Sequence, residues 1–265
     1  MDRTRIYLGT QGWSYRDWVG PFYPPGTTSR EYLSRYARIF DAVELDTTFY
    51  GIPGRDRVEA WRSSTPDGFQ FSAKVPRSIT HDARLVNAQS EMVEFLRTME
   101  ELGEKLGPVL VQLPPDFTAQ ERPALTAFLG ALPAGFAYAV EFRHRSWLTD
   151  ETYDLLRERE IAWTMIDLSY MPRHVEVTAD FTYVRWLGNR RAIERVHEVQ
   201  IDRRAELDAW AERLEEVAKR VQRIYGFVNN HYSGHSPADV LYLQRRLGIQ
   251  QREPPEDRPQ QGSLL

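Results

Sequence analysis

Residues 42–50 read AVELDTTFY, and this stretch constrains how the whole chain can fold. Apolar residues alternate with acids here, which is the pattern of a short β-strand with one apolar and one polar face. Val43 and Leu45 suit a covering layer of helices, so Glu44 and Asp46 are expected to point to the opposite side of the strand. In a closed barrel that opposite side is the interior, because side chains alternate between the interior and the helix layer.

Seven further apolar runs resemble this one in being rich in β-branched and aromatic residues and in being bounded by Gly, Pro, Asp or Asn. They are IYLG (6–9), FQFSAKV (69–75), VLVQLPP (109–115), AYAVEFR (137–143), IAWTMIDL (161–168), FTYVRWLG (181–188) and IYGFVNN (224–230). Helical patterns separate them, so we predict an α/β fold, a (β/α)8 TIM-like barrel of parallel strands with its active-site loops at their carboxyl ends. An open doubly wound sheet is the alternative, but GTQGW after the first run lacks the third glycine of a dinucleotide-binding loop.

Four stretches have a helical pattern, and three of them carry recognisable end signals. Residues 28–40 begin with Thr28 or Ser29 as a cap, and residues 91–107 repeat apolar positions until Gly107. Residues 203–222 are amphipathic, and residues 236–248 are predicted to start with Ser236 as the cap. We expect one barrel domain over residues 1–249, followed by a polar, proline-rich and disordered tail over residues 250–265.

The composition narrows the classes of protein. A chain of 265 residues with 42% hydrophobic residues can bury a sizeable core. It has no cysteine, which excludes disulfides, thiolate catalysis and cysteine-ligated metals. A net charge of -4 indicates no global attraction to nucleic acid or anionic lipid. No apolar run approaches the roughly 18–20 residues of a membrane span, and the start lacks a signal-peptide core, so we expect a cytoplasmic protein without a membrane partner.

The alternation also predicts which polar side chains share the barrel interior near the carboxyl ends of the strands. Besides Glu44 and Asp46, these are Ser72, Lys74, Gln112, Glu141, Arg143, Asp167, Arg185 and Asn229. Buried charges must pair with one another, with water or with a ligand. One interpretation is an internal salt-bridge network. The other is a binding site, because barrel enzymes carry out their chemistry at this rim.

The acids of this set allow two kinds of chemistry. Glu44 and Glu141 would serve as a general acid and base if they converge in a cleft. Together with Asp46 or Asp167, they would instead complete an oxygen shell around a divalent metal ion. The three nearby cations compete with a metal for these carboxylates.

The cations of the set indicate an anionic substrate, because guanidinium groups bind phosphate and carboxylate bidentately and lysine adds a point charge. They are Lys74, Arg143 and Arg185. The groups expected to orient the substrate are Gln112 and Asn229. Among the histidines, His81 and His231 are the better candidates for proton transfer.

Aromatic side chains crowd the loop GWSYRDWVGPFY (12–23), which should lie across the top of the barrel. We expect most of these rings to pack together as a rigid lid. Trp13 and Tyr50 are expected to face the substrate, and Trp147 lies in another top loop that would join them.

Six stretches of the chain together resemble a known family. They are GTQGWSYRDWVGPFYP, VELDTTFYGIP, FQFSAKVPRSITHDARL, LGPVLVQLPPDF, AVEFRHRSW and FVNNHYSGHSPADV, in that order. Over about residues 5 to 248, the sequence is similar to the family called domain of unknown function 72 (YecE-like). The resemblance implies a TIM-like barrel and no proven activity. A likeness of the cleft to barrel endonucleases that act on abasic DNA has been proposed for relatives, which is an analogy of fold.

The residues that this resemblance implies overlap the inward set. They are Gly9, Gly12, Trp13, Tyr15, Glu44, Thr48, Phe49, Tyr50, Lys74, His81, Gln112, Pro114, Glu141, Arg143, Trp147, Arg185, Asn229 and Asn230. Three positions depart from the family pattern. Gln11 stands where a small Ser or Cys is common, Asp46 replaces a usual Asn, and Leu187 stands where a His usually precedes the glycine. The last departure weakens any mechanism that needs a histidine or a metal ligand on the seventh strand.

The leading hypothesis is an acid/base enzyme of the hydrolase or lyase type that acts on an anionic, phosphate-bearing substrate in the charged cleft at the barrel mouth. No nucleotide cofactor is expected, and a divalent metal stays open. One alternative is a protein that binds or processes nucleic acid, with Arg190, Arg191 and Arg195 meeting phosphates. Another is a non-catalytic sensor of a small metabolite. The sequence sets neither the substrate nor the oligomeric state.

Overall fold

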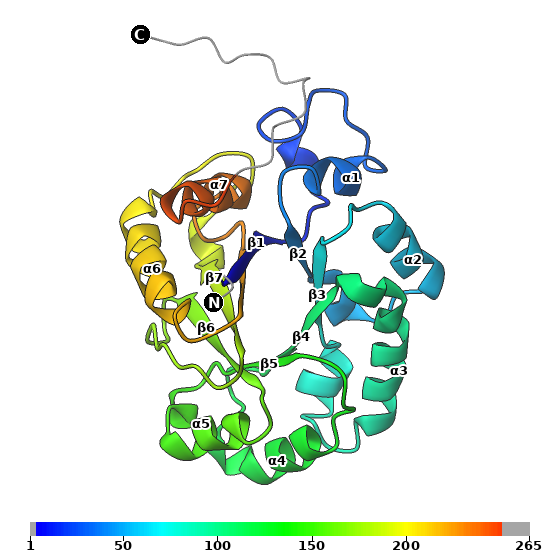
Figure 1. Cartoon of the computed structure of the whole chain (residues 1–265), viewed down its shortest axis with the longest axis vertical. Helices are drawn as coiled ribbons and strands as arrows, with labels where there is room; N and C mark the ends of the chain where they lie inside the picture. The colour runs from blue at the N-terminus through cyan, green and yellow to red at the C-terminus, as the bar shows by residue number, and fades with distance from the viewer. Residues whose placement is uncertain (1–3, 251–265) are drawn as a thin grey trace.

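A computed structural model describes residues 4–250 of the chain and forms a closed barrel of eight strands (Figure 1). Each strand pairs in parallel with the next, and the last pairs with the first. The strands are β1 (Arg5–Gln11), β2 (Ala42–Leu45), β3 (Gln70–Lys74), β4 (Leu106–Gln112), β5 (Tyr138–Glu141), β6 (Ala162–Leu168), β7 (Phe181–Gly188) and β8 (Arg223–Val228). The predicted (β/α)8 TIM-like barrel is therefore confirmed.

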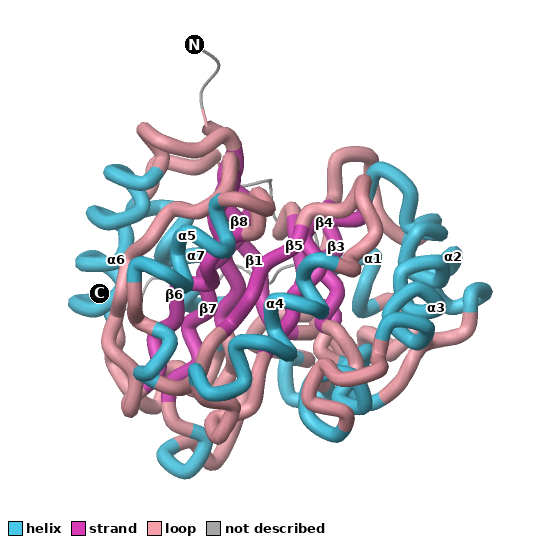
Figure 2. Tube along the Cα trace, turned by 90° about the horizontal axis from the view of Figure 1, so that it is seen from below, coloured by secondary structure: helices cyan, strands magenta, loops and turns pink. Residues whose placement is uncertain are grey.

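The helices lie outside the strands, as Figure 2 shows with helices in cyan around the magenta barrel. They are α1 (Tyr32–Tyr36), α2 (Arg55–Ser63), α3 (Gln89–Met99), α4 (Arg122–Gly130), α5 (Asp150–Arg157), α6 (Arg204–Val217) and α7 (Ser236–Arg246). The connection between β6 and β7, residues 169–180, forms no helix. Within residues 4–250, no helix is long and apolar enough to cross a bilayer. The predicted tail from residue 251 onward lies outside the described residues.

The first predicted helix is shorter than its pattern suggested. Thr28 does not cap it, because the Thr28 hydroxyl and backbone N–H both donate to the carboxylate of Glu31, at 2.8 and 2.9 Å. The α-helix begins only after Glu31 and spans five residues. The segment before it is a turn closed by a side chain, which uses the same polar residues that a helix cap would use.

Two other predicted helix ends are wrong. Gly107 does not end the second helix, because α3 stops at Met99, a 3-10 turn follows, and Gly107 lies within β4. Ser236 is the first residue of α7 and not its cap, since His235 occupies the cap position. The Ser236 hydroxyl instead donates to Asn230 at 2.8 Å and ties the helix to the end of β8.

A buried tyrosine fixes α1 to the first two strands. The Tyr36 hydroxyl accepts the backbone N–H of Thr10 at 2.8 Å and donates to the carbonyl of Ala42 at 3.0 Å. Gly9 makes this approach possible, because a Cβ at that position would lie 1.8 Å from the Ala42 carbonyl oxygen. These contacts hold the start of β2, and hence Glu44 two residues later, in a fixed place.

Strand β7 illustrates how the sequence divides the core between the barrel interior and the helix layer. Phe181 and Tyr183 belong to the interior cluster, whereas Val184 and Trp186 pack with the helices. The interior is apolar near the amino ends of the strands, where Tyr7 and Tyr225 stack with centroids 5.0 Å apart. The polar side chains therefore collect at the carboxyl ends.

The aromatic loop after β1 packs mainly onto α1 and the chain that follows it. Phe22 stacks on Phe40 with centroids 5.4 Å apart, and Tyr23 stacks on Tyr32 at 4.7 Å. Trp18 between them is fully buried. The prediction that most of these rings pack together is confirmed, and their burial stabilises the loop by roughly 1.5–3 kcal/mol for each large side chain.

Candidate functional site at the carboxyl ends of the strands

Polar side chains from most of the strands meet inside the barrel at the carboxyl ends. The strand register places Gln11 beside Glu44 and Gln112 beside Glu141. The side chains that form this mouth are Gln11, Glu44, Lys74, Gln112, Glu141, Arg185 and Asn229, with Arg143 just after β5. Nearly all are buried, so protein groups or a ligand must satisfy their charges and hydrogen bonds.

Arg185 of β7 is the centre of a buried ion network. It donates twice to Glu44 of β2, from Nη2 at 2.7 Å and from Nε at 2.9 Å, and its Nη1 donates to Glu141 of β5. Both carboxylates are fully buried. The Tyr183 hydroxyl also donates to Glu44, at 2.7 Å, and lies 2.6 Å from the Ser72 hydroxyl. An internal salt-bridge network is therefore correct for Arg185 and the two glutamates.

Glu141 is also held by Arg143, whose Nε donates to it at 2.6 Å. Burial alone would raise the pKa of Glu141, but Arg143 and Arg185 outweigh burial and lower that pKa to about 2. At neutral pH Glu141 is therefore ionised and has no proton to donate. The expected acid/base pair of Glu44 and Glu141 is not favoured by this geometry, because both carboxylates are occupied by arginine.

Lys74 of β3 has no carboxylate partner among residues 4–250. Its Nζ lies 3.8 Å from the centroid of the Phe49 ring, which is a cation–π contact. The side chain is only 9% exposed. Burial, followed by the charges of Arg185 and Arg143, lowers the pKa of Lys74 to about 7, against the opposing effect of Glu141 and Glu44. The amine is therefore partly uncharged near neutral pH.

His81 follows β3 in a π-helical turn, a rare element that is frequent at functional sites. Its ring lies 5.0 Å from the Phe49 ring, and its Nδ1 lies 2.9 Å from the Thr80 hydroxyl. Burial lowers the pKa of His81 to about 4, with Lys74 and Arg77 as the next causes. The imidazole is therefore neutral at physiological pH and next to the lysine.

The turn that carries His81 is followed by strained backbone. Arg84, Leu85 and Asn87 have positive φ values of 49, 69 and 55°, which residues other than glycine rarely adopt. Arg84 braces the segment, since it donates twice to Glu121 at 2.7 Å. Strain of this kind persists only where the surrounding structure fixes it, and it is concentrated at functional sites.

Amide side chains complete the mouth. Asn229 donates to Oε1 of Gln11 at 2.7 Å and accepts the backbone N–H of His231 at 2.8 Å. Gln112 donates to the carbonyl of Leu113 at 2.6 Å. The Nε2 atom of Gln11 is buried without a hydrogen-bond partner in the described part of the chain, and so is Nδ1 of His231. Unpaired buried donors and acceptors are rare, and a ligand or water is the usual partner.

Asp167 was expected to face the interior, and the structure contradicts this. Its carboxylate accepts hydrogen bonds from the indole of Trp210 in α6 at 2.7 Å, the hydroxyl of Tyr232 at 3.0 Å and Nε of Arg173 at 2.9 Å. These partners lie in the helix layer and the loops. The reason is that IAWTMIDL is apolar at both alternating positions, so Ile166 rather than Asp167 is the inward residue.

Trp147 does not line the mouth. It is fully buried between Phe117 and Phe142, and its indole donates to the carbonyl of Phe117 at 2.8 Å. Trp13 is half-buried and packs edge-on against Trp61 of α2, with ring centroids 5.7 Å apart. Packing energy determines both positions, because a large apolar ring gains more in a core than at a wet rim.

Tyr50 is 85% exposed, and its ring lies edge-on to Phe49 with centroids 5.5 Å apart. Of the three aromatic candidates it is the one most accessible to solvent, and hence to a ligand. Nothing in the local sequence pattern indicates how far this ring extends from the core.

The metal alternative finds no support in the geometry. In residues 4–250 no group of three or more His, Asp or Glu side chains is placed to hold a metal ion. Arginines occupy Glu44 and Glu141, and Asp167 lies on the other side of the sheet. Asp46 stays near Glu44, and burial, followed by the Glu44 charge, raises the pKa of Asp46.

Three residues of the site were not predicted from the alternation of the strands: two were missed, and one was implied only by the family resemblance. Tyr183 and Gln11 are inward by the same alternation that identified Arg185 and Glu44, so counting every second residue would have found them. Phe49 was implied by the family pattern alone. Its contact with Lys74 depends on the 3-10 turn Thr47–Tyr50 after β2, which has no clear sequence signal.

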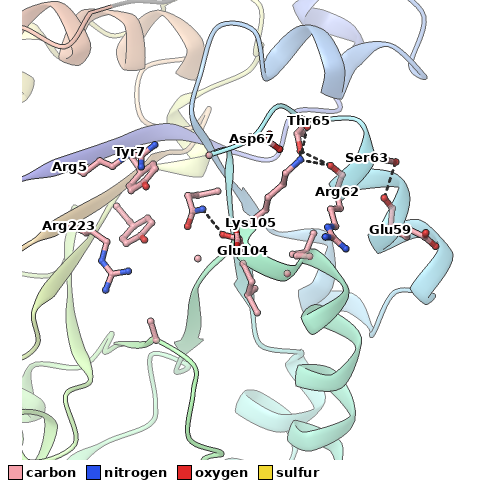
Figure 3. A pocket seen from close by; sticks show the side chains of 18 residues that line it. Arg5, Tyr7, Glu59, Arg62, Ser63, Thr65, Asp67, Glu104, Lys105 and Arg223 are labelled. Atoms are coloured by element: carbon pink, nitrogen blue, oxygen red, sulfur yellow. Dashed lines mark hydrogen bonds between the residues drawn. The ribbon is translucent and has the colours of Figure 1, made fainter.

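Two large hollows of the described molecule lie at the opposite end of the barrel. One, of about 900 Å³, is lined by Arg5, Tyr7, Lys105 and Arg223 (Figure 3). Lys105 donates there to the carbonyls of Arg62 and Thr65, at 2.7 and 2.6 Å. The other, of about 1060 Å³, lies beside it. Lys105 is satisfied by backbone and the partly exposed Arg223 lies beside Asp180, so the described lining of these hollows includes no fully buried cation.

Comparison with known proteins shows which family and which individual proteins this chain is similar to. A family model described as protein of unknown function DUF72 matches residues 7–263. The UPF0759 protein YecE of Escherichia coli (strain K12) is 42% identical over 139 residues, which is 52% of this chain and 48% of YecE. The UPF0759 protein YunF of Bacillus subtilis (strain 168) is 33% identical over 156 residues, 56% and 54% of the two chains. The matched stretch thus spans about half the length of these relatives.

Solved structures agree with the barrel. A DUF72 family protein from Thermotoga maritima is 30% identical and has a TM-score of 0.78, covering 92% of this chain and 99% of that one. A DUF72 family protein from Enterococcus faecalis also has a TM-score of 0.78 at 21% identity, covering 95% and 99%. The second likeness concerns the fold alone.

Proposed function

This chain belongs to the family described as protein of unknown function DUF72, and from its barrel mouth we propose that it is an enzyme of the lyase type that binds a small anionic substrate. The observation that carries the proposal is the set of unused cationic donors at the mouth. The Lys74 ammonium has no carboxylate within ion-pair distance among the described residues, and Arg143 engages Glu141 through Nε alone. A phosphate or carboxylate group would supply the acceptor that these donors lack.

The anion would bind between Lys74 and Arg143. Arg143 uses only its Nε on Glu141, and its two terminal nitrogens have no hydrogen-bond partner among the described residues. Its side chain is 21% exposed, so a ligand at the mouth can reach it. Glu44 and Glu141 then act as positioning residues that hold Arg185 and Arg143 in place, and not as proton donors.

The remaining groups would orient the substrate and move protons. His81 is neutral and next to Lys74, so it can accept a hydrogen bond or a proton. Gln112, Asn229 and Gln11 supply amide groups at the rim. We favour a lyase over a hydrolase because arginine occupies both Glu44 and Glu141, which leaves neither carboxylate free to activate water.

Thermal unfolding with added anions tests this proposal. Inorganic phosphate and pyruvate are titrated into the wild type, and a melting temperature that rises and saturates is expected. Arg143→Gln and Lys74→Met should remove most of the rise, whereas Arg220→Gln, an exposed change after α6, should keep it. A rise with neither anion, or an equal rise in Arg143→Gln, would contradict anion binding. Stabilising compounds that the wild type consumes and Lys74→Met does not would identify an enzyme rather than a sensor.

Nucleic acid is a second candidate, supported by Tyr50 and by Arg190 and Arg191 after β7, all exposed. An exposed ring can stack on a base while arginines contact phosphates. Binding of single-stranded DNA measured at several salt concentrations tests it, because phosphate contacts make affinity fall steeply with salt. Affinity that is weak at low salt, or that Tyr50→Ala leaves unchanged, would exclude this candidate.

A further inference from the structure

The basic residues of this chain are divided very unequally between arginine and lysine. Of the 34, only three are lysines, Lys74, Lys105 and Lys219, and the other 31 are arginines. This sequence therefore uses arginine at nearly all of its cationic positions. Lys74 nevertheless lies in the barrel mouth, near Arg143 and Arg185. A lysine at this position is explained if its amine has a role that a guanidinium cannot fill.

The three lysines occupy different surroundings. Lys219 is exposed and pairs with Glu216 at 2.6 Å. Lys105, at the amino-terminal end of the barrel, donates to two backbone carbonyls at 2.7 and 2.6 Å. Lys74 is buried, contacts the Phe49 ring, and has no hydrogen-bond acceptor within residues 4–250. Its nitrogen lone pair is therefore not used by the protein once the amine loses its proton.

An amine can lose its proton and act as a nucleophile, whereas the guanidinium of arginine stays charged. Burial beside other cations is the arrangement that activates a lysine, because it lowers the pKa. The pKa of Lys74 is lowered to about 7, so the uncharged amine is well populated at neutral pH. The two flanking arginines thus do more than bind an anion, since they also disfavour the ammonium form.

We propose that Lys74 is a nucleophile that forms an imine with a small carbonyl compound carrying a carboxylate or phosphate group, which Arg143 holds. The inference rests on the proposed anion site and adds the chemistry of the substrate. The amine nitrogen attacks the carbonyl carbon, and its proton passes to the carbonyl oxygen to give a carbinolamine. The C–O bond then breaks, one further proton from solvent leaves with the oxygen as water, and a protonated imine remains.

The surroundings of Lys74 fit this step. Phe49 covers the nitrogen and limits access of water to the imine. Arg143 is fixed by Glu141 through Nε, and its side chain is 21% exposed, so its terminal nitrogens stay available to an anion. A 2-oxo acid has its carboxylate on the carbon next to the carbonyl, so an anion on the arginine brings the reacting carbon near the amine. The protonated imine is an electron sink, which is the chemistry that lyases use to break bonds beside it.

Reductive trapping tests the proposal. Native protein is incubated at pH 7 with pyruvate and cyanoborohydride, whose hydride adds to the imine carbon and makes the link permanent. Intact mass and peptide mapping then locate the adduct among the three lysines and the amino terminus. We expect Lys74 to react about tenfold faster than Lys219, since its amine is partly uncharged where an ordinary lysine is almost fully protonated. Lys74→Arg should abolish that adduct, and Lys105→Arg should leave it unchanged.

Acetone, a neutral carbonyl of similar size, provides the second measurement. Faster trapping by pyruvate than by acetone at Lys74, and not at Lys219, supports a substrate anion on Arg143. Loss of that preference in Arg143→Gln supports the same assignment. If neither compound modifies Lys74 faster than Lys219, the nucleophile is refuted. Anion binding that still raises the melting temperature in that case leaves the proposed function standing, so the two failures are distinguishable.

Discussion

The two ends of this barrel both present arginine and lysine, but they satisfy those cations in different ways. At the amino-terminal end, Lys105 donates to backbone carbonyls and Arg223 is 43% exposed beside Asp180. At the carboxyl-terminal end, two buried carboxylates enclose Arg185, and Lys74 has an aromatic ring in place of an acid. A hollow of about 900 Å³ lies at the first end, and the buried amine that has no carboxylate partner among the described residues lies at the second. Charge and burial, rather than volume, therefore locate the candidate site.

The largest effect should come from removing the central arginine. Arg185→Met leaves Glu44 and Glu141 buried without their shared partner, and we expect the free energy of unfolding to fall by about 3–5 kcal/mol. Arg223→Met at the other end removes a half-exposed cation 3.6 Å from Asp180, and we expect a loss of at most about 1 kcal/mol. Urea unfolding followed by circular dichroism measures both.

A triple variant keeps this comparison informative if Arg185→Met does not fold. Adding Glu44→Gln and Glu141→Gln removes both stranded charges and should restore part of the lost stability. Equal losses in Arg185→Met and Arg223→Met would mean that the network at the mouth is as hydrated as the opposite end.

The next effect concerns the pH dependence that Lys74 contributes. Its pKa is about 7 in the folded protein and near 10.5 in the unfolded chain, so between these values the unfolded chain binds more protons and stability rises with pH. The cost of burying the ammonium is fully present below pH 7 and disappears above about pH 10.5. The charged or titratable groups that act on it are Glu44, Asp46, His81, Glu141, Arg143 and Arg185.

The measurement is the difference in unfolding free energy between the wild type and Lys74→Met at pH 7 and pH 10. We expect Lys74→Met to be the more stable protein at pH 7, with an advantage that shrinks by about 2 kcal/mol by pH 10. Lys105→Met is the control at the opposite end: burial lowers the pKa of Lys105 too, but this residue lines an open hollow, so the change should be much smaller. An advantage independent of pH would show that Lys74 is charged and compensated.

How far the sequence predicts this site depends on how cleanly each strand alternates. VELDTT and AVEFR alternate strictly, and they placed Glu44 and Glu141 correctly. IAWTMIDL is apolar at both positions, so Asp167 was assigned to the wrong face. Trp147 sits in a top loop by sequence, yet its ring enters the core because apolar burial outweighs position along the chain.

Strand alternation does not predict which charged side chains pair across the barrel. Arg185 and Glu44 are 141 residues apart in the chain, and only closure of the barrel brings them together. Alternation shows that both point inward, but it gives no distance between them. For that reason the choice between an acid/base pair and an internal ion network could not be made from the sequence, whereas the fold could.

A third effect should come from the hydroxyl that supports this network. Tyr183→Phe removes the donor to Glu44 at 2.7 Å, and we expect a loss of about 1.5 kcal/mol because the acceptor is a buried charge. Tyr225→Phe, in the stacked pair at the opposite end, should cost about 0.5 kcal/mol. Thermal unfolding in parallel measures the difference. A larger loss for Tyr225→Phe would reverse the ranking of the two ends.

The smallest effect tests whether Lys74 and His81 share one electrostatic environment. Burial, then Lys74 and Arg77, lower the pKa of His81 to about 4, with Asp82 opposing and Arg143 assisting. Because the unfolded histidine titrates near 6.5, stability falls as pH drops from about 6.5 to about 4. His81 is partly exposed, so solvent screening limits this loss to less than about 1 kcal/mol.

NMR of the His81 ring should give a titration midpoint near pH 4. Lys74→Met should move that midpoint toward 6.5, because it removes one cation while burial and Arg77 remain. Lys105→Met should not move it, since that amine lies at the far end of the barrel. A midpoint that Lys74→Met leaves unchanged would show that the charge of Lys74 does not act on His81. The charged residues of the mouth would then interact only in separate pairs.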